Sequence, residues 1–378
     1  MRSTIGVGII GANPDRGWAH DAHIPAIQAS PQFELRAVST SHTETAERAG
    51  RIYGVPSFDT PEALVKHPAV ELVVIAVKVP KHKMLVKAAL AERKAILCEW
   101  PLGNGLEEAV ELAEKAEALG VKGFVGLQAR SAPGFRHVSS LLRQGYVGEV
   151  LSTSIVASGG SWGSVIERQS AYILDESNGA SLLTIPFGHT MEGVCYCLGE
   201  ADYLSAEMAT RRNTVTEIET GQQLAMTVAD QIAVSGRLQS GATLSAHFRG
   251  GLSSGLNFHW EINGTEGDIV VSGENGLSQM CELVVAGAKT GNGLTRIPTP
   301  PNCLWAPSGS GSPAGAPFNV AQAYALIAKD LSDGGHRSPT FNDAVKRHRM
   351  LEAVEKAART GLRQSYLEDQ GRGNCRHV

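Results

Sequence analysis

Lys78 is the side chain whose type and position best suit proton transfer. It comes directly after the apolar run 70–77, which is typical of a strand buried on both faces of a parallel sheet. Such sheets bind ligands at the carboxyl ends of their strands, so the lysine would lie beside a bound molecule. If it is partly shielded from water, it would give up its own proton readily and could accept one from a hydroxyl group. A solvated lysine, or one that pairs with a phosphate, is the alternative.

His189 is the second candidate for proton transfer or for a hydrogen bond to a substrate. It stands between Gly188 and Thr190 at the expected start of a helix. Imidazole gives or takes a proton near neutral pH, which makes histidine a frequent acid or base. A histidine in this setting can also be a structural residue with satisfied hydrogen bonds, so two interpretations stay open.

A glycine-rich turn near the N-terminus predicts a dinucleotide site. Residues 6–11 match the pattern GxGxxG, but Gly6 and Gly8 fall inside the apolar run 5–10. A pyrophosphate binds to the amides of the turn that follows the strand, so we expect the binding turn to begin at Gly11. The cofactor contacts expected in this loop are Gly11, Ala12, Asn13 and Trp18. An ordinary glycine-rich turn is the alternative.

The expected second strand, 33–38, ends without the carboxylate that usually binds the ribose hydroxyls of NAD. Its end carries Ser39, Thr40 and His42 instead. These side chains would not repel a 2′-phosphate, so NADP would be tolerated. No arginine follows at this point, so the sequence leaves NAD and NADP both open.

The first third of the chain alternates strand-like and helix-like segments, and the rest is rich in strands. The alternation predicts an α/β fold, with the doubly wound parallel sheet of a Rossmann domain in residues 1–126. The later pattern predicts an α+β domain over 127–367, built on a large, mostly antiparallel open sheet. The strands expected in the second domain are 150–157, 203–211, 224–236, 242–249, 257–263 and 268–272. We also expect helices at 318–333 and 340–360, a loop at 306–317 and a loose tail at 368–378.

Composition argues against several classes of partner. The net charge is -4 and no block of basic residues stands out, which disfavours nucleic acid. No apolar run approaches the ~20 residues that span a bilayer, so no membrane association is expected. The six cysteines lack metal-ligand spacing, so we expect no metal. Scattered thiols without an export signal are typical of a cytoplasmic protein.

Short motifs in a fixed order resemble those of the glucose–fructose oxidoreductase/inositol dehydrogenase/MocA family. They are His23-Ile-Pro-Ala-Ile27, Val73-Val-Ile-Ala76, Leu97-Cys-Glu-Trp-Pro-Leu102, Gly126-Leu-Gln-Ala-Arg130 and Gly264-Thr-Glu-Gly267. The resemblance implies an NAD(P)-dependent oxidoreductase for a sugar, cyclitol or similar polyhydroxylated substrate. It also implies a homo-oligomer, dimer or tetramer, that assembles through the C-terminal sheet.

Two catalytic groups of this family are missing here. The family's Glu-Lys-Pro motif, whose lysine assists proton transfer, is Glu99-Trp100-Pro101. The family's acid four residues before the histidine is Ile185, while His189 is kept. The departures resemble the branch of the galactose-regulon repressors, which keep the dinucleotide-binding fold but act as regulators. The alternative function is therefore a catalytically silent dinucleotide-binding regulator, whereas Lys78 as a replacement base favours an enzyme.

The resemblance implies further contacts to the cofactor and the substrate. Further cofactor contacts are expected from Val77, Lys78, Pro80, His82, Glu99, Trp100 and Gln128. For Trp100, filling the junction between the domains is an equally good interpretation. Aromatic faces and charged groups hold carbohydrates, so a substrate pocket is expected to contain Arg130, Trp162, Tyr172, Glu176 and His189.

Overall fold

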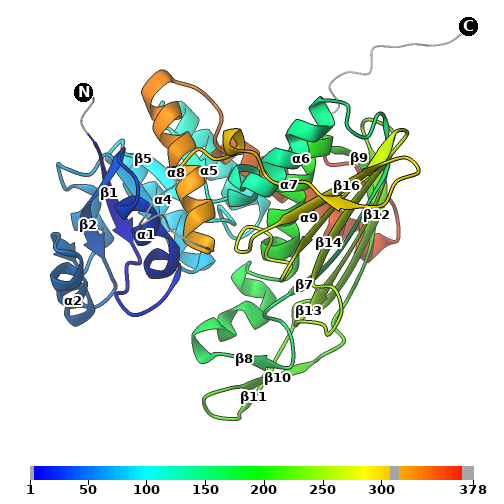
Figure 1. Cartoon of the computed structure of the whole chain (residues 1–378). Coiled ribbons are helices and arrows are strands. Elements are labelled where there is room, and N and C mark those ends of the chain that lie inside the picture. The colour runs from blue at the N-terminus through cyan, green and yellow to red at the C-terminus, as the bar shows by residue number, and fades with distance from the viewer. Residues whose placement is uncertain (1–3, 307–314, 368–378) are drawn as a thin grey trace, which may run out of the picture.

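The computed structural model describes residues 4–306 and 315–367, and two domains lie side by side in it (Figure 1). The first domain contains a parallel sheet of six strands in the order β3-β2-β1-β4-β5-β6. Its strands are β1 (Ile5–Ile10), β2 (Phe33–Ser39), β3 (Ser57–Phe58), β4 (Leu72–Ile75), β5 (Ala95–Cys98) and β6 (Gly123–Val125). The predicted Rossmann fold is confirmed, and the strand order reverses direction between β1 and β4.

Helices cover both faces of this sheet because its central strands are apolar on both sides. Val73 and Ile75 of β4 pack into one buried cluster, whereas Leu72 and Val74 pack into another. Side chains alternate between the two faces of a strand, so a run without polar residues needs a cover on each. The helices of the first domain are α1 (Ile24–Gln28), α2 (Thr43–Tyr53), α3 (Pro61–Val65), α4 (His82–Ala91) and α5 (Leu106–Ala118), with short helical turns η1 (Ala19–His23) and η2 (Val79–Lys81).

Gly6 and Gly8 lie inside β1, as the sequence predicted. A Cβ atom on Gly6 would lie 1.9 Å from the carbonyl oxygen of Ala69. Gly8 is inside the same strand, and the turn begins at Gly11, which has a φ of 96°. Gly6 therefore lets a neighbouring segment approach the strand, and the turn itself depends on Gly11.

The second domain is built on an eight-stranded sheet in the order β17-β16-β15-β14-β7-β13-β12-β9. Its strands are β7 (Val150–Gly159), β9 (Ala201–Ala209), β12 (Gln231–Leu238), β13 (Thr243–Gly250), β14 (Phe258–Gly264), β15 (Gly267–Gly273), β16 (Val284–Lys289) and β17 (Thr295–Arg296). Strands β7 and β13 run parallel and the other pairs run antiparallel, which confirms the mostly antiparallel sheet. A second, three-stranded sheet contains β8 (Val165–Ile166), β10 (Thr214–Glu217) and β11 (Gln223–Ala225).

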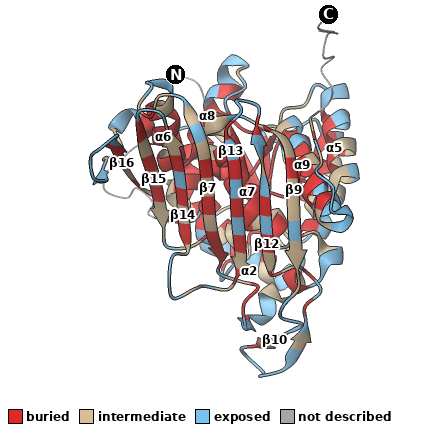
Figure 2. Ribbon diagram, turned by 90° about the vertical axis from the view of Figure 1, so that its right-hand side faces the viewer, coloured by how far each residue is buried: buried red, intermediate tan, exposed pale blue. Residues whose placement is uncertain are grey.

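One face of the large sheet is buried and the other is open. Ile232, Val234 and Phe248 point into the core, where helices α6 (Pro133–Arg143), α7 (Gly188–Leu198) and α9 (Phe341–Thr360) lie. The opposite face lies toward the viewer in Figure 2, in front of the helices, and along strands such as β12 and β13 exposed or half-buried residues alternate with buried ones. The sheet therefore has one face packed on the core and one in contact with solvent.

The chain returns to the first domain with helix α8 (Ala316–Asp333). This helix packs against η1 and α1, and Tyr324 and Ile327 join the buried cluster of the first sheet. The predicted boundary at residue 126 stays a prediction. The predicted tail 368–378 and residues 307–314 of the predicted loop lie outside the described residues.

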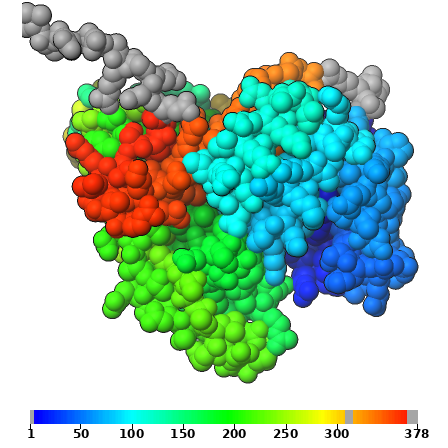
Figure 3. Space-filling view, turned by 180° about the vertical axis from the view of Figure 1, so that it is seen from behind, coloured from blue at the N-terminus to red at the C-terminus, as the bar shows by residue number. Residues whose placement is uncertain are grey.

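The two domains meet along a seam. Seen from behind, the blue and cyan first domain and the green second domain enclose a hollow between them (Figure 3). Several segments line the junction: the loop after β5, the short turn η3 (Gln128–Ser131), η6 (Leu183–Phe187) and the start of α7. Within the described residues, no helix is long and apolar enough to cross a membrane.

Candidate functional site

A pocket of about 460 Å³ opens at the carboxyl ends of β1, β2 and β4. It lies where the strand order reverses, which is the usual ligand site of an open α/β sheet. Six of the predicted cofactor residues line it: Gly11, Asn13, Ser39, Thr40, His42 and Val77. The other lining residues are Ile10, Arg16, Ser41, Thr45, Pro61, Lys81, Met84 and Leu85. The pocket therefore gathers the expected turn and the expected end of the second strand.

The first amides of the turn are already used within the chain. The amides of Gly11 and Ala12 both donate to the carbonyl oxygen of Ser39, at 2.9 and 3.2 Å, and the amide of Asn13 donates to that of Gly11. They tie the turn to the end of β2, so the expectation that they receive a pyrophosphate does not fit this geometry. The side chains of Asn13 and Arg16 line the pocket beside this turn.

The loop after Gly11 is held against helix α2. Asp15 forms an ion pair with Arg48 of α2, and the hydroxyl group of Tyr53 donates to the carbonyl oxygen of Asn13. Trp18, at the end of this loop, is half-buried against the first domain's core and does not line the pocket. The loop thus follows α2, which brings Arg16 to the pocket.

Lys78 meets the second domain at its Tyr172. The Nζ atom of Lys78 lies 4.6 Å from the centre of the Tyr172 ring, which belongs to η4 (Arg168–Leu174). Lys78 is exposed, so the partial shielding expected for it is absent. Burial raises the pKa of Tyr172. This contact therefore places the predicted base, Lys78, against Tyr172, a residue of the predicted substrate pocket.

His82 and Pro80 follow Lys78 but differ in setting. Pro80 is exposed in η2. His82 is buried, and its Nδ1 and Nε2 atoms lie 2.8 and 3.0 Å from the carbonyl oxygens of Pro101 and Val77. Burial lowers the pKa of His82. Because both ring nitrogens face backbone, His82 holds the loops after β4 and β5 together and has no free nitrogen for a cofactor.

Glu99 is the centre of a hydrogen-bond network at the end of β5. The Nε2 atom of His23 lies 3.0 Å from its Oε1 atom, and the amide of Gln128 donates to the same oxygen at 2.9 Å. The Nδ1 atom of His23 lies 2.9 Å from the hydroxyl group of Tyr324 on α8. Gly126 leaves room for the carboxylate, since a Cβ atom there would lie 2.6 Å from it. Four elements therefore fix the orientation of Glu99.

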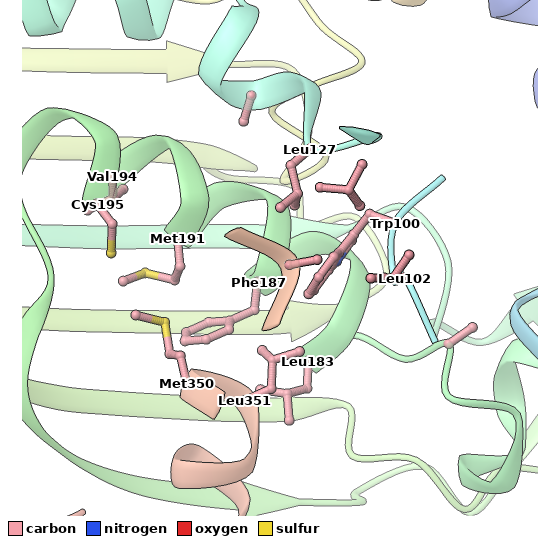
Figure 4. Close-up of a cluster of buried hydrophobic side chains, with 14 of the residues drawn as sticks. Trp100, Leu102, Leu127, Leu183, Phe187, Met191, Val194, Cys195, Met350 and Leu351 are labelled. Atoms are coloured by element: carbon pink, nitrogen blue, oxygen red, sulfur yellow. The ribbon is translucent and has the colours of Figure 1, made fainter. Parts of the chain in front are cut away.

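Trp100 fills the junction between the domains. Its side chain is buried, its Nε1–H donates to the carbonyl oxygen of Thr184 at 2.6 Å, and its ring lies 4.7 Å from that of His348. In Figure 4 it lies near Leu127 and Leu102 in a buried apolar cluster that also includes Phe187. Of the two interpretations, the structure supports packing.

His189 is buried at the start of α7 with an unused nitrogen. Only 4% of the residue is exposed, and its Nδ1 atom has no hydrogen-bond partner within the described residues. Burial lowers the pKa of His189 to about 4, and the charge of Glu99 opposes this shift. The imidazole is therefore neutral at neutral pH and retains a nitrogen that could take part in a hydrogen bond with a ligand.

Arg130 and Trp162 are not free to line a sugar pocket. Arg130 forms ion pairs with Glu192 and Asp343, and Glu192 also pairs with Arg347. Trp162 is buried, and its Nε1–H donates to the carbonyl oxygen of Ile173 at 3.1 Å. Both residues stabilise the second domain, so the expectation that they bind substrate does not fit their contacts.

Glu176 lies at a different pocket, of about 280 Å³. This pocket is also lined by Glu352, Glu355 and His348. Thr184, whose carbonyl oxygen accepts the hydrogen bond from Trp100, lines it too. Glu176 therefore does not line the pocket at the ends of β1, β2 and β4. Within the described residues, no group of three or more His, Cys, Asp or Glu side chains could hold a metal ion.

Several site residues were not predicted from the sequence. His23 belongs to the motif at residues 23–27, but nothing in that motif indicates that it pairs with Glu99. Tyr324 is 301 residues away from His23 in the chain, and no sequence signal connects them. Arg16 is one arginine in a polar loop, and only the fold brings it to the pocket.

Comparison with known proteins agrees with this arrangement. A model of an oxidoreductase family with an NAD-binding Rossmann fold matches residues 5–127, and a model of the Gal80p C-terminal domain matches 133–273. The galactose/lactose metabolism regulatory protein GAL80 of Saccharomyces cerevisiae is 30% identical over 305 residues, covering 74% of this chain and 69% of that protein. Dehydrogenase aclE of Aspergillus oryzae is 27% identical over 389 residues, covering 98% of this chain and all of that protein.

Solved structures share the fold over nearly the whole chain. A super-repressor mutant of Gal80p from Saccharomyces cerevisiae has a TM-score of 0.85 at 26% identity, covering 96% of this chain and 98% of that one. A levoglucosan dehydrogenase in complex with NADH and L-sorbose has a TM-score of 0.80 at 22% identity, with the same coverage. The chain therefore belongs to the Gfo/Idh/MocA family of NAD-binding oxidoreductases, in the branch that includes the Gal80 regulators.

Proposed function

We propose that this chain is an NAD(P)-dependent oxidoreductase that transfers a hydride between the nicotinamide and a sugar, cyclitol or similar polyhydroxylated substrate. The observation that carries the proposal is the contact between Lys78 and Tyr172, which joins a basic group and an aromatic face across the domain cleft. The full-length match to dehydrogenase aclE supports an enzyme, because that protein is named a dehydrogenase.

The pocket between β1 and β4 fits one end of a dinucleotide. It is of ligand size and combines hydroxyl groups, cations and apolar side chains, which suits a ribose, a phosphate and a base. When bound, the cofactor would supply the nicotinamide carbon that accepts or donates the hydride. Glu99, oriented by His23 and Gln128, would border the nicotinamide end.

In the reduction direction Lys78 would give a proton to the carbonyl oxygen as the hydride reaches the carbonyl carbon, and in the oxidation direction the neutral amine would take that proton back. Position 100, where the family has a lysine, holds a buried tryptophan. Lys78 forms no ion pair within the described residues and is exposed, so its amine can turn toward a substrate. Tyr172 would offer its ring as a stacking face for the sugar, and the neutral imidazole of His189 would form a hydrogen bond with a substrate hydroxyl group.

Turnover by the wild-type protein and by Lys78→Ala tests this function. A panel of sugars and cyclitols is followed at the nicotinamide absorbance, and the Kd of the dinucleotide is measured by calorimetry. We expect Lys78→Ala to lower kcat by ~100-fold or more with an unchanged Kd, because only the proton transfer is lost. Lys66→Ala, at an exposed position outside the pocket, is the matched control. Unchanged turnover in Lys78→Ala would refute the role of the lysine.

A second candidate function is a dinucleotide-binding regulator without turnover. The observation that favours it concerns Trp100, which stands where the family motif has a lysine. Its side chain contacts Thr184 and His348, so this position serves packing and supplies no group for proton transfer. Two Gal80 relatives are named regulatory proteins. The same assay separates the two functions, since a regulator would bind the dinucleotide with a measurable Kd and convert no member of the panel.

We also propose a homo-oligomer that assembles through the open face of the eight-stranded sheet (Figure 2). Small side chains such as Ala233, Ser235 and Ser245 lie side by side on this face and would let a second sheet approach closely. Light scattering coupled to gel filtration should report a dimer or tetramer for the wild type. Ser245→Arg should reduce the mass toward that of the monomer, and a monomeric wild type would contradict the proposal.

A further inference from the structure

We infer that the pocket between β1 and β4 selects the 2′-phosphate of NADP(H), and that Arg16 is the residue that recognises it. This inference rests on the proposed function only in requiring that a dinucleotide occupies the pocket. It assigns a role to a residue from the first loop, whereas an arginine after the second strand is the usual solution in Rossmann folds.

The first step is the position of Arg16. The loop that carries it is tied to helix α2 by the ion pair between Asp15 and Arg48 and by the hydrogen bond from Tyr53 to Asn13. Arg16 therefore lines the pocket together with residues from the end of β2, although it follows β1 in the chain. It is exposed, and within the described residues it forms no ion pair that would occupy its guanidinium group.

The second step is the division of the pocket lining into two sorts of side chain. Apolar groups suited to an adenine ring come from Pro61, Val77, Met84 and Leu85. Hydroxyl groups, an imidazole and cations suited to a ribose phosphate come from Arg16, Ser39, Thr40, Ser41, His42, Thr45 and Lys81. None of the residues that line the pocket is acidic. The pocket wall therefore has no carboxylate that would repel a 2′-phosphate, and none that would bind the ribose hydroxyl groups of NAD in its place.

The third step is the N-terminus of α2, which begins beside the pocket. Its N-cap residue His42 makes no side-chain capping bond, so amides of the first turn remain available to an anion. The positive end of the helix dipole adds to this attraction. Two carboxylates stand nearby: Asp59 accepts a hydrogen bond from Thr43, and Glu44 is exposed in the first helical turn. Neither lines the pocket.

Guanidinium groups bind phosphates by paired, charge-assisted hydrogen bonds, which neutral hydroxyl groups cannot replace. NAD(H) lacks the 2′-phosphate and would leave Arg16 without its partner. We therefore expect the chain to bind NADPH at least about tenfold more tightly than NADH.

Calorimetry on the full chain tests the inference with four probes: NADPH, NADH, 2′,5′-ADP and 5′-AMP. The last two carry or lack the 2′-phosphate without a nicotinamide, so they report on the pocket alone. Arg16→Ala should lose the preference for NADPH and for 2′,5′-ADP, while its affinity for NADH stays within about twofold of the wild type. Arg51→Ala is the matched control, because this arginine lies on α2, pairs with Glu47 and does not line the pocket.

The outcomes separate this inference from the proposed function. Equal Kd values for NADPH and NADH in the wild type would overturn the inference but leave dinucleotide binding intact. An equal loss of affinity for both dinucleotides in Arg16→Ala would also overturn it, since the arginine would then hold the pyrophosphate that both share. Absence of binding by all four probes would overturn the proposed function as well.

Discussion

The Nε1 atom of Trp100 lies 2.6 Å from the carbonyl oxygen of Thr184, and this hydrogen bond joins the first domain to the second. Trp100 follows the last strand residue of β5 by two positions, whereas Thr184 belongs to η6, just before helix α7. The indole also packs on His348 of α9. Trp100 stands where the family motif has a lysine, and here its side chain links the two domains by a hydrogen bond and by packing.

Replacing Trp100 by phenylalanine should weaken this contact between the domains. Trp100→Phe keeps most of the ring but removes the N–H group, which leaves the carbonyl of Thr184 without this donor. We expect a loss of about 1–3 kcal/mol in the free energy of unfolding, measured by urea denaturation. Trp18→Phe is the matched control, because the Nε1 atom of Trp18 has no hydrogen-bond partner within the described residues, so less should be lost.

The same variant distinguishes packing from contact with the cofactor. We expect NADPH binding to change the tryptophan fluorescence of the wild type. If Trp100 packs as described, this change should persist in Trp100→Phe. A fluorescence change that disappears in this variant and survives in Trp18→Phe would mean that the Trp100 indole stacks on the nicotinamide.

Regular periodicity made most of the fold predictable. The strand expected at 242–249 is β13, and the helix expected at 340–360 is α9. The run 224–236 was expected as one strand but forms the end of β11 and most of β12, in two different sheets. The break lies at Asp230, a buried acid that accepts hydrogen bonds from the amide of Arg211 and the side chain of Arg212. Such a polar anchor between apolar runs depends on distant partners, which local patterns do not report.

The candidate site was predictable where it is local in the chain. The hydroxyl groups after β2 and the carboxylate of Glu99 follow strands, so their place at the sheet edge could be inferred. The sequence did not show whether Arg130 binds a substrate or forms an ion pair within the protein. Its partner Glu192 lies 62 residues away, and the pairing depends on how α7 packs beside η3.

Breaking the buried ion pairs around Glu192 should destabilise the protein strongly. Glu192→Gln removes the charge that faces both Arg130 and Arg347 and leaves buried cations with fewer partners. We expect a loss of about 3–5 kcal/mol in the free energy of unfolding by urea denaturation. The matched control is Glu34→Gln, whose partner Arg36 is well exposed, and it should lose less than about 1 kcal/mol. A small effect of Glu192→Gln would contradict a structural role for Arg130.

Acid should destabilise the fold through its buried histidines. Burial lowers the pKa of His348 to about 4, below its ordinary value of 6.5. Between these pH values the unfolded chain binds more protons than the folded one, so stability falls as the pH drops from 6.5 toward 4 and then stops changing on this account. His189, whose pKa is also lowered to about 4, acts in the same direction.

A variant isolates the contribution of His348 from that of the carboxylates. His348→Phe removes one titrating group, so between pH 7 and pH 4.5 it should lose ~2 kcal/mol less stability than the wild type. The exposed His336→Phe should follow the wild-type curve. Identical pH dependence in His348→Phe and the wild type would show that the imidazole is not buried as described.

Replacing Gly11 by alanine should damage both the fold and the pocket. Gly11 has a φ of 96°, and a Cβ atom there would lie 2.3 Å from the carbonyl oxygen of Ala76. The turn after β1 must then move away from the end of β4, which changes the wall of the dinucleotide pocket.

Gly54 is the matched control, because its φ is also positive, at 68°, but nothing lies within 4 Å of its Cβ position. Gly54→Ala should cost about 1 kcal/mol in unfolding free energy and leave the Kd for NADPH unchanged. Gly11→Ala should cost more, because the clash adds to the strain, and should weaken NADPH binding at least about tenfold. Equal effects of the two substitutions on calorimetric Kd would mean that the turn does not form the pocket.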